Sequence, residues 1–146
     1  MPAGIDRVNV LNPTAIITSI EKMVMSKKDL DEIFIRRLIS AIYFAIFNYW
    51  AAKQFSKGVR GKGPNQDSFT FSEFHRDLLK MGLDAEIIIL FQCRVAVDHY
   101  IMNPASINIY NQEIVNALGM QKTSLAINRK ILNRVISASK SIIKSL

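Results

Sequence analysis

Cysteine is nearly absent from this sequence: the chain of 146 residues contains one, Cys93, which excludes a disulfide within the chain. A single thiol is typical of proteins in a reducing compartment. The two histidines, His75 and His99, lie far apart in the sequence and, with one cysteine, provide no zinc-ligand spacing. We therefore expect neither a bound metal nor another cofactor.

Long hydrophobic runs are missing as well. The most apolar stretch, 38–52, is interrupted by Ser40 and Asn48 and is shorter than the roughly 20 residues that span a bilayer, so it is typical of a core helix. No basic region followed by a long apolar core is present at the start, which excludes a secretory signal. We expect a cytoplasmic protein that does not enter a membrane.

Two common catalytic patterns are also lacking. The glycine-rich stretch 58–66, GVRGKGPNQ, has neither the spacer nor the Gly-Lys-Ser/Thr ending of a P-loop. No nucleophile-elbow motif supports a Ser/His/Asp arrangement. The stretch and its surroundings carry Lys57, Arg60 and Lys62 without a carboxylate, so they form either a solvated connection or an RNA contact.

Acidic residues are the minority charge, 12 against 19 lysines and arginines, which gives a formal charge of +7. None lies between Glu32 and Asp67, and none follows Glu113, whereas the C-terminal segment carries several cations, including Arg129 and Lys130. This distribution favours an anionic partner, with nucleic acid the first candidate. The alternative that the surplus lysine only keeps a helical protein soluble stays open.

What the sequence does contain is helical periodicity throughout, with no convincing strand. It predicts an all-α fold, an antiparallel bundle of four or five helices, in a single domain at 12–146 that follows an N-terminal arm at 1–11. The predicted helices cover about 13–25, 29–56, 71–81, 84–102 and 124–146, and Gly119 either separates a further helix from the last one or lies within it. Asn12-Pro13, Asp84 and the capping box of Thr70 and Glu73 mark helix starts.

The predicted helix at 84–102 is apolar and yet carries Arg94, Asp98 and His99. Burying such groups costs several kcal/mol unless they are paired or face a cleft. Arg94 and Asp98 are four residues apart, which predicts an ion pair. His99 is five residues from Arg94, about 140° around a regular helix, so the three are not expected to meet on one ideal helix. Either the helix loosens at its end, or side chains converge from two subunits of a twofold dimer.

Arginine and histidine together suffice for one reaction without a metal. A histidine near neutrality takes a proton from a ribose 2′-hydroxyl or returns one to the leaving 5′-oxygen. The arginine fork stabilises the negative charge that develops on the phosphoryl oxygens. Arg94 and His99 therefore indicate RNA cleavage. By contrast, we expect Cys93 to be a buried structural thiol and His75 to be a partly exposed surface histidine.

At these residues the sequence resembles the HEPN family of small all-α domains. The segment Arg94-Val-Ala-Val-Asp98-His99 matches the family's R-x4-H motif, and 41–54, AIYFAIFNYWAAKQ, is similar to the aromatic-alanine pattern of its second long helix. The order FHRDLLKMG, a helix, R…DHY and a basic C-terminal helix is similar too. The resemblance covers roughly residues 14–146.

The resemblance implies a five-helix bundle that forms a homodimer with both motifs in a shared cleft. It implies a metal-independent endoribonuclease, often the toxin of a pair whose antitoxin is a small nucleotidyltransferase, with Arg94 and His99 as the catalytic pair and Asp98 and Tyr100 in support. The alternative is a non-catalytic HEPN module that binds a nucleotide, RNA or a nucleotidyltransferase partner. The apolar Val95, where catalytic members frequently carry a polar residue, favours this alternative. A third possibility is an ion pair and a packed histidine without any ligand.

Overall fold

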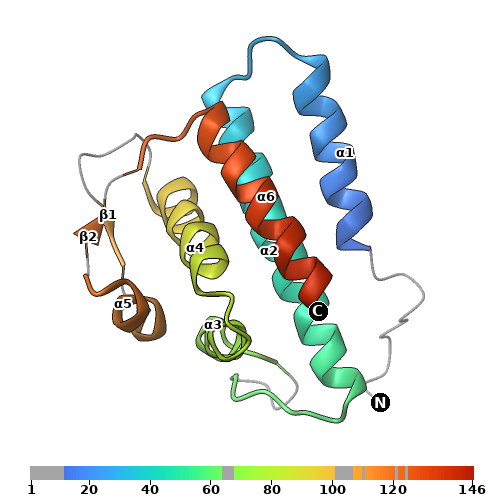
Figure 1. Ribbon diagram of the computed structural model, residues 1–146, viewed down its shortest axis with the longest axis vertical. Helices are drawn as coiled ribbons and strands as arrows, with labels where there is room; N and C mark the ends of the chain where they lie inside the picture. Colours follow the sequence, from blue (N-terminus) through green and yellow to red (C-terminus); the bar gives the residue numbers. More distant parts are fainter. Residues whose placement is uncertain (1–11, 64–67, 101–106, 110, 121, 124) are drawn as a thin grey trace.

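The computed structural model describes residues 12–63, 68–100, 107–109, 111–120, 122–123 and 125–146 (Figure 1). The helices are α1 (Pro13–Ser26), α2 (Glu32–Ser56), α3 (Phe71–Lys80), α4 (Asp84–His99), α5 (Gln112–Leu118) and α6 (Arg129–Ser145). Two strands, β1 (Ile107–Asn108) and β2 (Lys122–Thr123), form a two-residue antiparallel ladder. The predicted arm at 1–11 lies outside the described residues.

The four long helices form the bundle. Along the chain α1, α2, α4 and α6 alternate in direction, and α4 packs against both α2 and α6 (Figure 1). Their contact surfaces are aliphatic, with side chains that have no exposed surface, among them Ile39, Ile42, Ile46, Leu90 and Val135. Each such side chain contributes about 1.5–3 kcal/mol by leaving water. The predicted all-α bundle is confirmed, although the described residues form six helices and not four or five.

Two predicted helix starts are wrong. The second helix begins at Glu32 and not near residue 29, because the Asp31 carboxylate accepts the N–H of Ile33 at 2.7 Å and so caps the helix there. The last helix begins at Arg129 and not at residue 124, again behind a capping side chain, that of Asn128. In both cases a polar side chain satisfies the first free N–H groups and fixes the start.

Both ends of α4 also differ in part from the prediction. Gly82, just before the helix, has the left-handed conformation that often follows the end of a preceding helix, with φ at 77°. The N-cap, however, is Leu83, which makes no side-chain capping bond, and Asp84 is the first helical residue. The helix ends at His99 because Tyr100 is extended, with φ at −125°. The predicted end at residue 102 is therefore wrong, since α4 stops three residues earlier.

The segment between α4 and α6 is not one continuous helix. Gly119 has φ at 79° and ends α5 in the left-handed conformation, which residues other than glycine rarely adopt. The sequence left this point open. The short ladder of β1 and β2 flanks α5, and α5 contacts α3 and α4. No helix in the described part of the chain is long and apolar enough to traverse a bilayer.

Candidate functional site

A pocket of about 400 Å³ lies where the C-terminal half of α4 meets β1 and the start of α5. Its lining consists of Phe91, Arg94, Val95, His99, Tyr100, Asn108 and Asn111. This volume falls in the range of small-molecule sites, roughly 300–1,000 Å³. Three of the four residues that the sequence predicted for catalysis and its support, Arg94, His99 and Tyr100, therefore line the same pocket; Asp98 reaches it only through Arg94.

Arg94, Asp98 and His99 form one cluster within a single chain. Nε of Arg94 lies 3.2 Å from Oδ2 of Asp98, which confirms the predicted ion pair. Nη1 of Arg94 lies 3.0 Å from Nε2 of His99. Of the two alternatives that the sequence left open, the structure matches the first, in which the helix does not continue: α4 ends at His99, and Tyr100 is extended. A second copy is not required to assemble the cluster, and the homodimer stays a prediction.

The contact with Arg94 defines the state of the His99 ring. A guanidinium has only donors, so Nε2 of His99 must be the accepting nitrogen and the ring proton must lie on Nδ1. The side chain of His99 is exposed, so solvent and ligands reach it. The cluster therefore presents an imidazole nitrogen next to a fixed positive charge.

Aromatic rings surround the other side of the Arg94 guanidinium, whose side chain is 15% exposed. Its Cζ lies 5.1 Å from the ring centroid of Phe71, 5.6 Å from that of Phe44 and 5.8 Å from that of Tyr43. The faces of aromatic rings attract a cation, by about 0.5–2 kcal/mol each. These rings and the carboxylate of Asp98 stabilise the positive charge of Arg94 at the pocket, although the side chain is largely buried.

Behind these rings is a buried pair that the sequence did not reveal. His75 has no exposed surface, so its predicted position at the surface is wrong. Its Nε2 lies 2.8 Å from the hydroxyl of Tyr43, and its ring packs 4.4 Å from that of Phe91, which lines the pocket. Burial lowers the pKa of His75 to about 4, with a further lowering by the Arg94 charge; Asn111 only partly opposes this. His75 is therefore neutral at physiological pH.

Arg36 of α2 holds the end of α4 in place. Its Nη1 donates to the carbonyl oxygens of Ala96, at 3.0 Å, and Tyr100, at 2.6 Å, while its Nε pairs with Glu32 at 3.1 Å. The last carbonyls of a helix have no partner within the helix and carry partial negative charge, which a cation stabilises. Arg36 thereby fixes the turn that carries His99.

Tyr100 joins α4 to the short ladder. Its hydroxyl accepts the backbone N–H of Asn108 at 2.9 Å. On the same side of the pocket, the side chain of Asn111 accepts the N–H of Ile114 at 3.3 Å and donates to Ser72 at 3.1 Å. The pocket wall opposite α4 is therefore positioned by Tyr100 and by the cap of α5.

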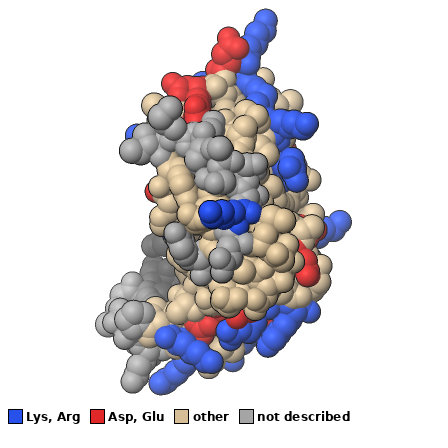
Figure 2. Space-filling view, turned by 90° about the vertical axis from the view of Figure 1, so that its left-hand side faces the viewer, with Lys and Arg blue, Asp and Glu red and all other residues tan. Residues whose placement is uncertain are grey.

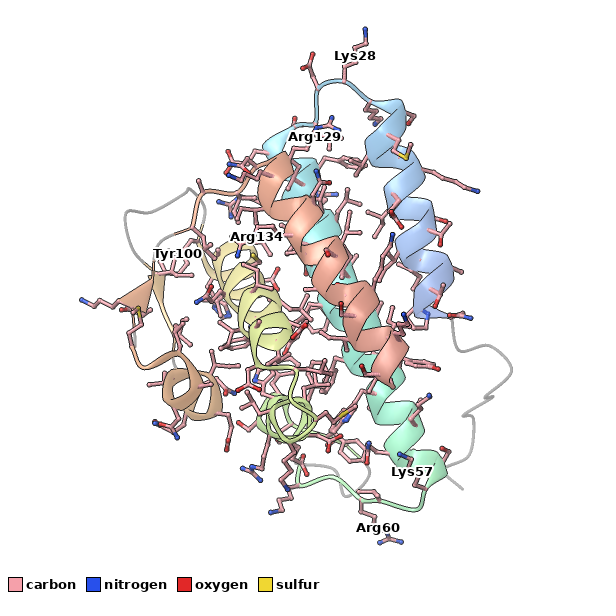
Figure 3. The ribbon with its side chains drawn as sticks, in the orientation of Figure 1. Lys28, Lys57, Arg60, Tyr100, Arg129 and Arg134 are labelled. Carbon is pink, nitrogen blue, oxygen red and sulfur yellow. The ribbon has the colours of Figure 1, made fainter. Side chains whose placement is uncertain are left out.

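None of the five cations predicted to contact nucleic acid, Lys57, Arg60, Lys62, Arg129 and Lys130, is among the described residues that line the pocket. Lys57 and Arg60 lie near one end of the bundle and Arg129 near the other (Figure 3). The face that carries α5 and the strands shows its lysines and arginines mainly around the rim (Figure 2). The structure therefore does not bring these cations together at the site.

Among the five predicted nucleic-acid contacts, Arg129 is distinguished by hydrogen bonds from its guanidinium to backbone carbonyls. It donates to the carbonyl of Val24 at 3.0 Å, and to those of Lys27 and Lys28. These are carbonyls at and just beyond the end of α1. The geometry gives Arg129 a structural role, whereas Lys130 is exposed.

Cys93 is fully buried, as predicted. Burial raises the pKa of its thiol to about 12, although the charge of Arg134 opposes the shift. The thiolate is the reactive form, so this thiol is inert at neutral pH. Among the described residues, no group of three or more His, Cys, Asp or Glu side chains is placed to hold a metal ion.

The sequence indicated the pocket's charged groups but not its other walls. Nothing in the sequence marked Phe91, Asn108 or Asn111 as residues that line a pocket. A signal for the burial of His75 did exist: it lies three and four residues from Leu78 and Leu79, on the apolar face of α3.

In comparisons with known proteins, the chain matches no protein-family model, no curated protein and no solved structure. What the structure itself describes is a small all-α protein whose pocket contains an arginine and a histidine in contact. The resemblance to the HEPN family stays a prediction that rests on the residues of the sequence.

Proposed function

We propose that this protein is a metal-independent endoribonuclease of HEPN type, whose catalytic groups are Arg94 and His99. The observation that carries the proposal is the contact of 3.0 Å between Nη1 of Arg94 and Nε2 of His99 at the wall of an open pocket. A fixed cation and a neutral imidazole within reach of one phosphate are the two groups that 2′-hydroxyl attack requires.

The reaction is a transesterification within the RNA. Nε2 of His99 takes the proton of the 2′-hydroxyl, the 2′-oxygen forms a bond to phosphorus, and the bond from phosphorus to the 5′-oxygen breaks. The leaving 5′-oxygen receives a proton from the imidazolium or from water. The products are a 2′,3′-cyclic phosphate and a 5′-hydroxyl end. Arg94 stabilises the negative charge on the phosphoryl oxygens.

Binding of the substrate frees the base in this scheme. Nε2 of His99 accepts a hydrogen bond from Arg94, so this nitrogen accepts the proton of a hydroxyl only after that bond is broken. A phosphate diester competes for the same guanidinium donors, since charge-assisted bonds to phosphate are stronger than bonds to a neutral ring. The lone pair of Nε2 then points to the 2′-hydroxyl. Asp98 keeps the guanidinium oriented through the exchange.

Incubation of the purified protein with RNA in excess chelator tests the proposal. Wild type should cleave and leave 2′,3′-cyclic phosphate ends, while Arg94→Ala and His99→Ala should each lose about 10²–10⁴-fold in rate. Arg37→Ala, which removes an exposed arginine of α2, is the matched control. RNA with a single 2′-deoxy residue at the cleavage position should resist. Equal activity of wild type and His99→Ala would remove His99 from the mechanism and reject the proposal.

The second candidate is a non-catalytic module that binds a nucleotide, RNA or a nucleotidyltransferase partner in the same pocket. The observation that favours it is the composition of the lining: Val95 is apolar and buried, and the charge of Arg94 is already paired with Asp98. This candidate predicts saturable binding without turnover. Retained nucleotide affinity in His99→Ala, together with no cleavage by wild type, would establish it. In either case the homodimer and the toxin–antitoxin pairing are tested by the mass of the protein in solution and by co-purification with a nucleotidyltransferase.

A further inference from the structure

The pocket extends well beyond the two groups that contact a phosphate. Apart from Arg94 and His99, its described lining is apolar, aromatic or amide in character: Phe91, Val95, Tyr100, Asn108 and Asn111. No second cation occurs among these described lining residues, so this part of the pocket is not suited to another phosphate. Aromatic rings next to amides are the chemistry that binds a nucleobase, through stacking and hydrogen bonds to its edge.

Of the two asparagines that line the pocket, Asn108 is the one whose side-chain amide has no hydrogen-bond partner among the described residues. Its backbone N–H donates to the hydroxyl of Tyr100 at 2.9 Å, and its backbone pairs with Lys122 in the ladder. Its side-chain amide makes no hydrogen bond within the part of the chain that the structure describes. Asn111 differs, since its amide caps α5 and donates to Ser72. Asn108 is therefore a lining residue that is held by its backbone, and its amide has no partner among the described residues.

Tyr100 supplies the adjoining surface. Its hydroxyl oxygen accepts the N–H of Asn108, so the hydroxyl proton is still available to a ligand. Arg36 binds the carbonyl of the same residue at 2.6 Å and so fixes its backbone. Tyr100 and Asn108 thus lie on backbone that hydrogen bonds hold in place, in the same pocket as Arg94 and His99.

We propose that Asn108 and Tyr100 form a nucleobase subsite, which sets the base preference of the site; the inference rests on the proposed function in assuming that a phosphate lies at Arg94 and His99. The base next to that phosphate lies along the Tyr100 ring. Its edge accepts from Nδ2 of Asn108 and donates to Oδ1. Adenine is the preferred base, since an amide pairs with its N6 and N7 through two hydrogen bonds.

The test has two readouts, binding and cleavage. The first is the affinity for AMP, GMP, CMP, UMP and inorganic phosphate, and the second is the cleavage of RNAs that differ in a single base. Wild type should prefer adenine over the other bases about tenfold, equivalent to roughly 1.4 kcal/mol. Asn108→Ala should reduce this preference to less than about twofold and leave the affinity for inorganic phosphate unchanged, because it retains Arg94. Asn133→Ala, the same change at an exposed position of α6, should behave as wild type.

A second variant keeps the test valid if the alanine variant unfolds. Asn108→Asp retains the size of the side chain but removes its donors, so it should weaken AMP binding while its melting temperature stays near that of wild type. Wild-type base preference in both variants, or no preference in wild type, would overturn the subsite. Base-dependent binding lost in both variants, without any RNA cleavage, would support the subsite and reject only the ribonuclease. Cleavage that depends on His99 but is blind to the base would do the reverse.

Discussion

His75 should make the stability of this protein depend on pH in a window that a single substitution removes. The side chain is fully buried, and its pKa falls from 6.5 to about 4, chiefly through burial. The unfolded chain therefore takes up a proton at a higher pH than the folded chain. The stability that the neutral ring provides is fully present above pH 6.5 and is lost as the pH falls from about 6.5 to about 4. Each pKa unit corresponds to 1.36 kcal/mol, so the free energy of unfolding falls by about 3 kcal/mol over this range.

The variant for this experiment is His75→Gln, which does not titrate and keeps a group that can bond to the hydroxyl of Tyr43. Urea unfolding at intervals between pH 7.5 and pH 4 gives the free energy of unfolding of both proteins. Their difference should change by about 3 kcal/mol in favour of the variant across that range. Carboxylates that titrate at the acidic end affect both proteins alike and cancel in the difference.

Asn133→Gln, a change between non-titrating side chains at an exposed position of α6, is the control for substitution as such. The pH dependence of its stability should follow that of wild type. Parallel curves for wild type and His75→Gln would refute the reasoning, since they would mean that the buried ring is protonated in the folded protein or reached by water.

Two further predictions concern the framework of the site. Arg36→Gln should lower the free energy of unfolding by about 2–3 kcal/mol, because the carbonyls of Ala96 and Tyr100 lose a charged donor; Arg37→Gln, at an exposed position, should change it by less than about 0.5 kcal/mol in the same urea titration. Gly119→Ala should cost about 1–2 kcal/mol through the backbone alone, because φ is 79° there while, apart from the two adjacent residues, no atom of the described residues lies within 4 Å of the added methyl group. An unchanged melting temperature in this variant would contradict the left-handed conformation.

The features that the sequence predicted correctly are mostly local ones, such as helix caps and ion pairs within one helix. The capping box of Thr70 and Glu73 and the left-handed Gly82 depend on neighbours a few residues away, and the structure contains both. The ion pair of Arg94 and Asp98 follows from a spacing of four residues, and it forms as predicted. Such features are decided within one or two helical turns, where the sequence contains the needed information.

Features that depend on tertiary structure were not predictable in the same way. The contact between Arg94 and His99 requires one particular arginine rotamer and a helix that ends at His99, and Arg36 of another helix helps to fix that end. The burial of His75 depends on how α3 docks. Asn108 reaches the pocket only because the hydroxyl of Tyr100 binds its backbone. None of these follows from residue spacing.

Arg129 has a consequence for the order in which the molecule assembles. Its guanidinium completes the end of α1 across a separation of 105 residues to Val24. A ribosome adds about 5–20 residues each second, so α1 waits at least several seconds for these donors. The first helix therefore leaves the exit tunnel with its last carbonyls facing water. Docking of α1 onto the start of α6 is therefore a late event in folding, because it awaits the synthesis of Arg129.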